Sequence, residues 1–121
     1  MKREYNKETN MTFTELLRWS KTPQSQEVSI KTKDDSIQAR KERRKLLEYL
    51  PLRVRKHAKK FNTAQIRNLS LLYTTEWDKF LESQGKKAVS YLKRAKKIKG
   101  KNTRNNIYAM RNWGFNKLKS S

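Results

Sequence analysis

The sequence predicts an all-α protein, a small helical bundle of five to six helices with a flexible basic N-terminal arm. Three observations support this class. The 121 residues include three glycines and two prolines, so turns are few. Apolar residues recur at helical spacings of three and four, and the alternation typical of β-strands is nearly absent. The length supports one domain, and 34% hydrophobic residues allow only a lean core.

Residues 1–33 are expected to form an arm with one short helix and a linker. The first eleven residues carry mixed charges without an apolar period, which is typical of a loose segment. Thr12 and Glu15 have the spacing of a capping box, so a helix should follow over 13–21. Pro23 should end it, because proline disfavours helical geometry in the residue before it. A polar linker should follow.

Residues 34–121 are expected to form one helical domain. Asp34 and Asp35 suit the positive end of a helix that should run to about Tyr49. Pro51 then marks a kink or a new helix start. Around this proline, apolar residues spaced 4, 4 and 3 apart predict one buried face, made by Leu50, Val54, Ala58 and Phe61.

The clearest apolar period lies in the middle of the chain, behind a capping signature at Asn62 and Gln65. Gaps of 3, 4, 4 and 3 predict one seam of about four turns, made by Ile66, Leu69, Tyr73, Trp77 and Phe80. The alternative is a break at Thr74–Thr75, with Thr75 and Asp78 capping a second segment. Gly85 is expected to end the helix.

Two further helices are expected in the last third of the chain. The first should cover 87–99, end at Gly100 and turn inward Val89, Leu92 and Ile98. The second should be capped by Asn102 or Thr103 and run to about residue 118. Its inward residues should be Ile107, Met110, Trp113 or Gly114, and Leu118.

Charge is segregated along the chain. There are 31 Lys and Arg against 11 Asp and Glu, a net charge of +20. Residues 40–60 contain ten cations and two acids, residues 61–85 are nearly neutral, and twelve cations but no acid follow Glu82. Surfaces that serve solubility alone usually mix the two signs, because unmixed charge repels itself. Two basic helical units around a near-neutral helix therefore indicate a polyanionic partner, most often a phosphate backbone.

The two basic units, 40–60 and 86–119, are expected to form a phosphate-binding surface. Side chains expected to contact nucleic acid are Arg40, Arg43, Arg44, Arg53, Lys56, Lys60, Lys93, Arg94, Lys96, Lys97, Lys101, Arg104, Asn106 and Arg111. Aromatic side chains lie among the tail cations, and bases can stack on such side chains in single-strand binders. For Tyr91 and Trp113, a core or rim position is the favoured interpretation.

Two alternatives compete with backbone binding. Helix 87–99, Gly100 and the following helix have the outline of a helix-turn-helix. It would place Arg104 and Asn106 where arginine reads guanine and asparagine reads adenine in the major groove. An acidic protein partner is the other alternative. A membrane surface is not expected, because no helix pairs strong amphipathicity with bulky apolar residues.

The sequence offers little for catalysis. It has no cysteine, its single histidine, His57, lies among cations, and its three glycines are scattered rather than gathered in a phosphate loop. We expect no enzyme, cofactor, metal or small-molecule substrate. No apolar stretch approaches the length of about 18 residues that indicates a membrane span. Met1-Lys2-Arg3 precedes no hydrophobic leader region. A cytoplasmic, nucleoid-associated or virion-associated protein is therefore expected.

Two short stretches resemble known nucleic-acid-binding families. The nine residues 61–69, Phe-Asn-Thr-Ala-Gln-Ile-Arg-Asn-Leu, resemble a helix start in the small helical subunit of type III CRISPR effector complexes. That family's later Tyr-x-Ala-Gly-Arg pattern is missing here. Residues 102–107, Asn-Thr-Arg-Asn-Asn-Ile, resemble the helix that opens the DNA-gripping N-terminal domain of tyrosine recombinases. Both resemblances imply a helical unit that grips a nucleic-acid backbone.

These observations together predict a non-catalytic nucleic-acid-binding protein, with DNA and RNA left open. Such a protein would serve as an accessory subunit of a larger nucleoprotein assembly, for example a CRISPR-type effector, a viral nucleoprotein or a ribosome-like particle. Other protein subunits would then be its second class of partner. The alternatives are a helix-turn-helix transcriptional regulator and an interaction protein that docks on an acidic partner.

Overall fold

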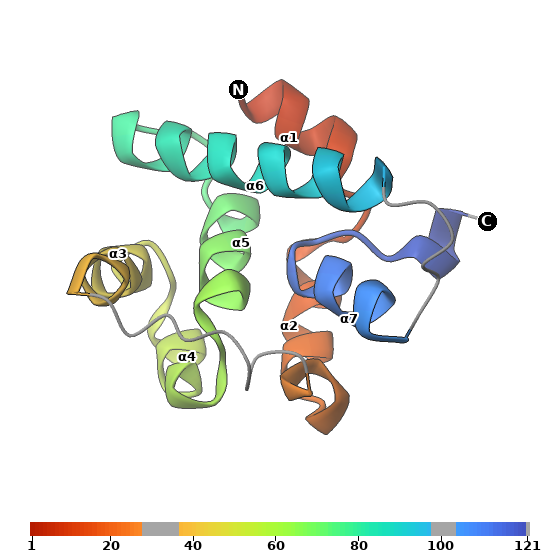
Figure 1. Ribbon diagram of the computed structural model, residues 1–121. Coiled ribbons are helices and arrows are strands. Elements are labelled where there is room, and N and C mark those ends of the chain that lie inside the picture. The colour runs from red at the N-terminus through yellow and green to blue at the C-terminus, as the bar shows by residue number, and fades with distance from the viewer. Residues whose placement is uncertain (28–36, 98–103, 121) are drawn as a thin grey trace.

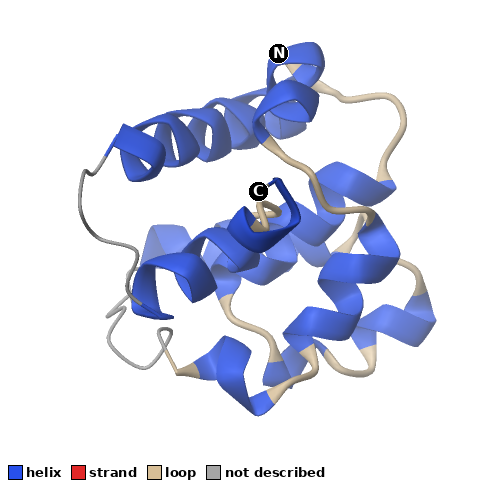
Figure 2. Cartoon of the chain, turned by 90° about the vertical axis from the view of Figure 1, so that its right-hand side faces the viewer, coloured by secondary structure: helices blue, strands red, loops and turns tan. Residues whose placement is uncertain are grey.

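A computed structural model of the chain describes residues 1–27, 37–97 and 104–120, and confirms the all-α class (Figure 1). In this part of the chain seven α-helices and three short 3-10 turns are joined by loops, and no strand occurs (Figure 2). The helices are α1 Lys2–Glu8, α2 Phe13–Ser20, α3 Ile37–Leu47, α4 Leu52–Arg55, α5 Thr63–Tyr73, α6 Lys79–Lys97 and α7 Arg104–Asn112. The 3-10 turns are η1 Pro23–Gln26, η3 Ala58–Lys60 and η4 Lys117–Ser120.

Helix α5 is the centre of the bundle. It packs against α2, α3, α6 and α7, and Figure 1 shows it between α3 on one side and α2 and α7 on the other, below α6. Ile66, Leu69 and Leu71 are buried on it. The Asn62 side chain accepts from the Gln65 amide at 2.8 Å, and the Gln65 side chain accepts from the Asn62 amide at 3.0 Å. The predicted capping box is confirmed, and it starts the central helix locally.

The N-terminal residues are not the loose arm that the sequence predicts. They form α1, which runs beside α6 in both views (Figures 1 and 2). Tyr5 is 0% exposed, and its hydroxyl donates to Oδ1 of Asn68 at 2.8 Å. Its ring meets Trp77 edge-on, 5.5 Å between centroids. One aromatic residue on a seven-residue helix produces no apolar period, so only the tertiary contacts reveal this anchor.

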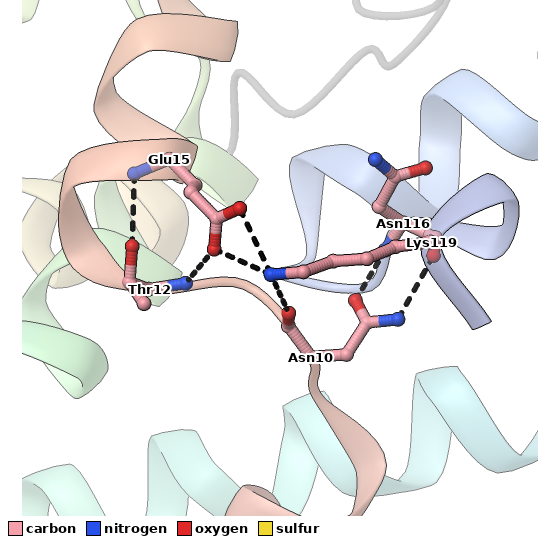
Figure 3. A network of polar contacts seen from close by, with 5 residues as sticks. All are labelled: Asn10, Thr12, Glu15, Asn116 and Lys119. Atoms are coloured by element: carbon pink, nitrogen blue, oxygen red, sulfur yellow. Dashed lines mark hydrogen bonds and ion pairs between the residues drawn. The ribbon is translucent and has the colours of Figure 1, made fainter.

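Helix α2 starts at the predicted capping box and ties the two ends of the chain together (Figure 3). Glu15 accepts from the Thr12 amide at 2.9 Å and also receives the Lys119 ammonium at 2.7 Å. Asn10 and Asn116 exchange two hydrogen bonds, of 2.9 and 2.7 Å. The C-terminal turn η4 is therefore held against the N-terminal third of the chain.

The segment between α2 and α5 follows the prediction in part. Within the expected linker, Pro23–Gln26 form η1, with Ser25 buried, while 28–33 and the predicted helix start at Asp34 lie outside the described residues. Pro51 is the N-cap of a new helix, α4, which confirms a start at this point. The predicted apolar residues are buried, namely Leu50, Val54, Ala58 and Phe61. Because α4 ends at Arg55 and η3 follows, these four residues share a core without belonging to one helix.

The predicted continuous seam from Ile66 to Phe80 is wrong, and the alternative of a break is confirmed. Helix α5 ends at Tyr73, which is 42% exposed, and α6 begins at Lys79. The cap of the second segment is Asp78, whose Oδ1 accepts from the Leu81 amide at 2.9 Å, rather than Thr75. Trp77 lies in the connection and donates from its indole nitrogen to the Leu71 carbonyl in the last turn of α5 and to the Thr74 carbonyl that follows it.

Gly85 does not end a helix, contrary to expectation, but lies inside α6. A Cβ at this position would lie 2.5 Å from the Trp77 ring, so the ring contacts the helix backbone where a side chain would collide with it. Glycine is needed here for close packing. Helix α6 continues to Lys97 with Val89 and Leu92 buried as predicted, whereas Ile98 and Gly100 fall outside the described residues.

Helix α7 is shorter than predicted. It ends at Asn112, and Gly114 adopts a φ of +88°. The Phe115 amide donates to the Met110 carbonyl at 3.0 Å, and the Gly114 amide donates to the Arg111 carbonyl at 3.1 Å. This is the glycine-terminated C-cap with paired backbone bonds known as the Schellman motif. Leu118 lies beyond it and is 64% exposed instead of inward, and the expected caps at 102 and 103 fall outside the description.

Candidate nucleic-acid interface

Helix α6 presents a row of cations on one side. Nineteen residues at 1.5 Å each make it about 28 Å long. The side that packs on the bundle buries Leu81, Ala88 and Leu92. The opposite side, within about 100° of arc, is the α6 basic face, defined by the exposed residues Lys86, Lys93, Arg94 and Lys97. The acid of this helix, Glu82, lies in its first turn, so no carboxylate of α6 interrupts the basic face.

A cleft of about 410 Å³ lies beside this face. It is bounded by α5, α6 and the loop that follows α7. Its lining, which defines the α6 cleft, is Arg67, Lys86, Lys87, Ser90, Tyr91, Arg94 and Trp113. Lys86 and Arg94 belong both to the cleft and to the basic face, so the cleft opens among exposed cations.

An aromatic pair forms one part of the cleft lining. The rings of Tyr91 and Trp113 are stacked, with centroids 4.3 Å apart and planes 19° apart. Both side chains are half-buried, which agrees with the expected rim position. The Arg67 guanidinium lies 5.3 Å from the Trp113 ring centroid. Burial raises the pKa of the Tyr91 hydroxyl, and the nearby Arg94 opposes this rise.

Arg67 is the buried member of the cleft, 7% exposed, and no pattern in the sequence singles it out. Its Nε donates to Gln84 Oε1 at 2.6 Å, and a terminal nitrogen lies 3.4 Å from Glu42 Oε2. Residues 61–85 are nearly neutral, so charge segregation directs attention away from this segment. The signal is tertiary, because α3 supplies the carboxylate and α6 supplies the amide.

Glu42 joins the cleft to α3. It pairs with Arg67 and receives the Lys87 ammonium at 2.5 Å. Burial by itself would raise the pKa of Glu42, but the hydrogen bond from Lys87 and the charges of Lys87 and Arg67 outweigh it and lower the pKa. The carboxylate is therefore ionised at neutral pH and holds two cations at the cleft.

The predicted contact residues of 40–60 divide into two groups. Arg43 donates from one terminal nitrogen to the carbonyls of Ala58 and Phe61, at 2.7 and 2.8 Å, and burial lowers the pKa of its guanidinium. It holds η3 against α3 rather than facing solvent. The other predicted residues are exposed on α3, on α4 and its C-cap, and on η3, namely Arg40, Arg44, Arg53, Lys56 and Lys60.

The predicted residues of the tail divide in the same way. Lys93, Arg94 and Lys97 lie on the α6 basic face. Lys96 instead points to α1, where its ammonium lies 3.0 Å from Glu8 Oε1 and 4.1 Å from the Phe115 ring centroid. Arg111 is half-buried, with its guanidinium 4.0 Å from the Trp19 centroid, and burial lowers its pKa.

Helix α7 offers little open surface for reading bases. Arg104 and Asn105 are exposed, Asn106 is half-buried, and no residue from 106 to 112 is exposed. The helix packs against α2, α5 and η1. Lys101 and the turn expected at Gly100 lie outside the described residues.

No protein-family model matches the chain, and neither the curated proteins nor the solved structures contain a match to it. Among the residues that the structure describes, no helix is long and apolar enough to cross a membrane. In the same residues, no group of three His, Cys, Asp or Glu side chains is placed to hold a metal ion. The exposed surface is therefore the basis for assigning a function.

Proposed function

We propose that the protein is a non-catalytic nucleic-acid-binding subunit that grips a phosphate backbone with the α6 basic face. The observation that supports this most directly is the alignment of exposed cations along one straight helix. Residues 86–97 extend over about 16 Å, which is long enough to meet several phosphates. Each Lys or Arg that neutralises a phosphate releases a condensed counterion, and this release favours binding entropically.

The placement of acids supports the same proposal. Carboxylates near α6 pair with cations other than those defining the basic face: Glu8 with Lys96, and Glu42 with Arg67 and Lys87. These pairs hold α1, α3 and α5 to α6. The cations of the basic face keep their charge directed outward, as a polyanion requires.

A chain with such unbalanced charge should be most stable in complex, because any partner that binds the folded state adds stability by mass action. An accessory role in a larger nucleoprotein assembly accounts for this better than free-standing regulation. The helix-turn-helix alternative needs an open recognition helix, and the partly covered α7 argues against it. An acidic protein partner is the outcome to expect if nucleic acid does not bind.

The test is fluorescence anisotropy with labelled single- and double-stranded DNA and RNA across a salt series. We expect affinity to fall steeply and linearly with salt on a log–log plot, with little dependence on sequence. Replacing Lys93, Arg94 and Lys97 with glutamine should weaken binding to every sequence. It should also reduce the slope of log affinity against log salt concentration by roughly two units or more.

Lys96→Gln is the matched control. It removes one charge from the same helix, but the structure places that charge on Glu8 and Phe115, so affinity should change little. If the triple variant binds as tightly as the wild type, the α6 basic face is not the interface. The same conclusion follows if Lys96→Gln weakens binding as strongly as the triple change does. No binding to any nucleic acid at low salt would refute the function.

A further inference from the structure

The α6 cleft combines features that a plain backbone-binding surface does not need. Exposed lysines alone are enough to attract phosphates. Here a stacked aromatic pair, Tyr91 and Trp113, lines a cleft of about 410 Å³ together with the buried Arg67. This volume is near the lower end of the range of roughly 300–1,000 Å³ in which small-molecule sites occur. A single planar group with a charged substituent matches that size.

The chemistry of the lining selects among planar ligands. Aromatic rings and arginine guanidinium planes are the groups on which unpaired bases stack in proteins that bind single strands. The rim supplies Lys86 and Arg94, which suit the phosphates on either side of such a base. Ser90 adds a hydroxyl that can donate or accept a hydrogen bond.

A base inside a duplex cannot reach these rings, because both of its faces are covered by neighbouring bases. We infer that the α6 cleft takes one unpaired nucleotide, with its base against the Tyr91–Trp113 pair and its flanking phosphates on the rim cations. This inference rests on the proposed function and adds to it a preference for single-stranded nucleic acid. The cleft tolerates any base, since every base has a π-face.

The test compares two single strands that differ only in their bases. One is an oligothymidylate of about 12 nucleotides, within the site sizes of single-strand binders, and the other is the same sugar-phosphate strand with abasic positions throughout. The wild-type protein should bind the thymidine strand about 5- to 150-fold more tightly, which is the range for stacking one base. Trp113→Ala should reduce this preference to nearly none, and Trp113→Phe, which keeps a ring, should retain most of it.

The outcomes separate this inference from the proposed function. Equal, tight binding of the two strands by the wild-type protein would overturn the inference and leave backbone binding intact. If Trp113→Ala reduces the affinity for both strands by the same factor, the inference is also overturned. Binding of neither strand at low salt would overturn both proposals. If circular dichroism shows that Trp113→Ala does not fold, the wild-type comparison and Trp113→Phe still decide the question.

Discussion

The two basic units of this protein carry similar numbers of cations, ten in 40–60 and twelve in 86–119, but present them differently. In 40–60 the chain breaks twice, between α3 and α4 and again before η3, so successive cations point in changing directions. Two of its arginines, Arg43 and Arg55, donate to main-chain carbonyls nearby. In α6 one uninterrupted helix aligns its cations along a single face. Helix continuity, more than the number of charges, distinguishes the two units.

The difference also concerns what lies beside the charge. Aromatic residues near 40–60 pack on other parts of the bundle. For example, Tyr49 stacks on Phe80, and the Lys45 ammonium lies over the Phe80 ring. Beside α6, Tyr91 and Trp113 line an open cleft. We therefore propose that backbone binding and base stacking occur at α6 and the α6 cleft, and that Arg43 and Arg55 have a mainly structural role.

Breaking α6 should have the largest effect. Ser90 is exposed in the middle of this helix, and Ser90→Pro removes a helical hydrogen bond and introduces a clash, at a cost of about 3 kcal/mol or more in unfolding free energy. Leu52→Pro is the control, because Leu52 is the first residue of α4, is 71% exposed and follows a residue with ψ of 157°. It should stay within about 1 kcal/mol of wild type. Urea unfolding measures the unfolding free energy of both variants. Equal losses of unfolding free energy would contradict the contrast between the units.

Removing Arg43 should have the next largest effect, and mainly on stability. Arg43→Ala takes hydrogen bonds from the Ala58 and Phe61 carbonyls, and charged hydrogen bonds of this kind contribute about 1.5–3 kcal/mol. Arg44→Ala changes an exposed neighbour and should alter unfolding by less than about 0.5 kcal/mol. Stability unchanged by Arg43→Ala would show that this arginine is available for binding after all.

A matched pair of double changes tests the contrast in binding. Lys93→Gln with Lys97→Gln should reduce the log–log salt slope on single strands by about 1.4, because two phosphate contacts are lost. Arg53→Gln with Lys56→Gln removes the same charge from α4 and its C-cap, and should change the slope by less than about 0.5. Anisotropy titrations at several salt concentrations measure both slopes. The opposite ranking would place the interface on α4.

The smallest expected effect is the pH dependence of the link between the units. The lowered pKa of Glu42 means that its ion pairs stabilise the fold above its usual pKa of 4.5, and that this contribution disappears as the pH falls through the lowered value. Glu42→Gln keeps an acceptor oxygen but removes the charge, so it should cost about 1 kcal/mol at neutral pH and flatten the loss of stability in acid. The measurement is the unfolding free energy of variant and wild type at several pH values in this acid range. If the two plots of free energy against pH run parallel, the charge of Glu42 contributes nothing to stability.

Local signals in the sequence were reliable guides to helix starts. Both capping boxes, at Thr12 and at Asn62, form as their spacing predicts, because each needs contacts within three residues only. Apolar periodicity was less reliable over longer distances. The gaps from Ile66 to Phe80 fit one helix, yet the chain breaks after Tyr73, where Trp77 packs against the backbone of α6 at Gly85.

The candidate site was predicted in part for the same reason. Lys93, Arg94 and Lys97 could be selected from charge segregation and helical spacing. Arg67 could not, since its role depends on Glu42 and Gln84 of other helices. Nor could the structural roles of Arg43 and Lys96, whose partners lie 15 to 18 and 88 residues away along the chain.

The sequence by itself determined the all-α class, the capped starts of α2 and α5, and the unbalanced charge. These properties depend on composition or on residues within about one helical turn, so no tertiary contact is needed to establish them. The tertiary structure alone decided that α1 is anchored by Tyr5, that α5 and α6 are separate, and which cations face solvent. It also brought Tyr91 beside Trp113, because only packing between distant helices places such side chains in contact.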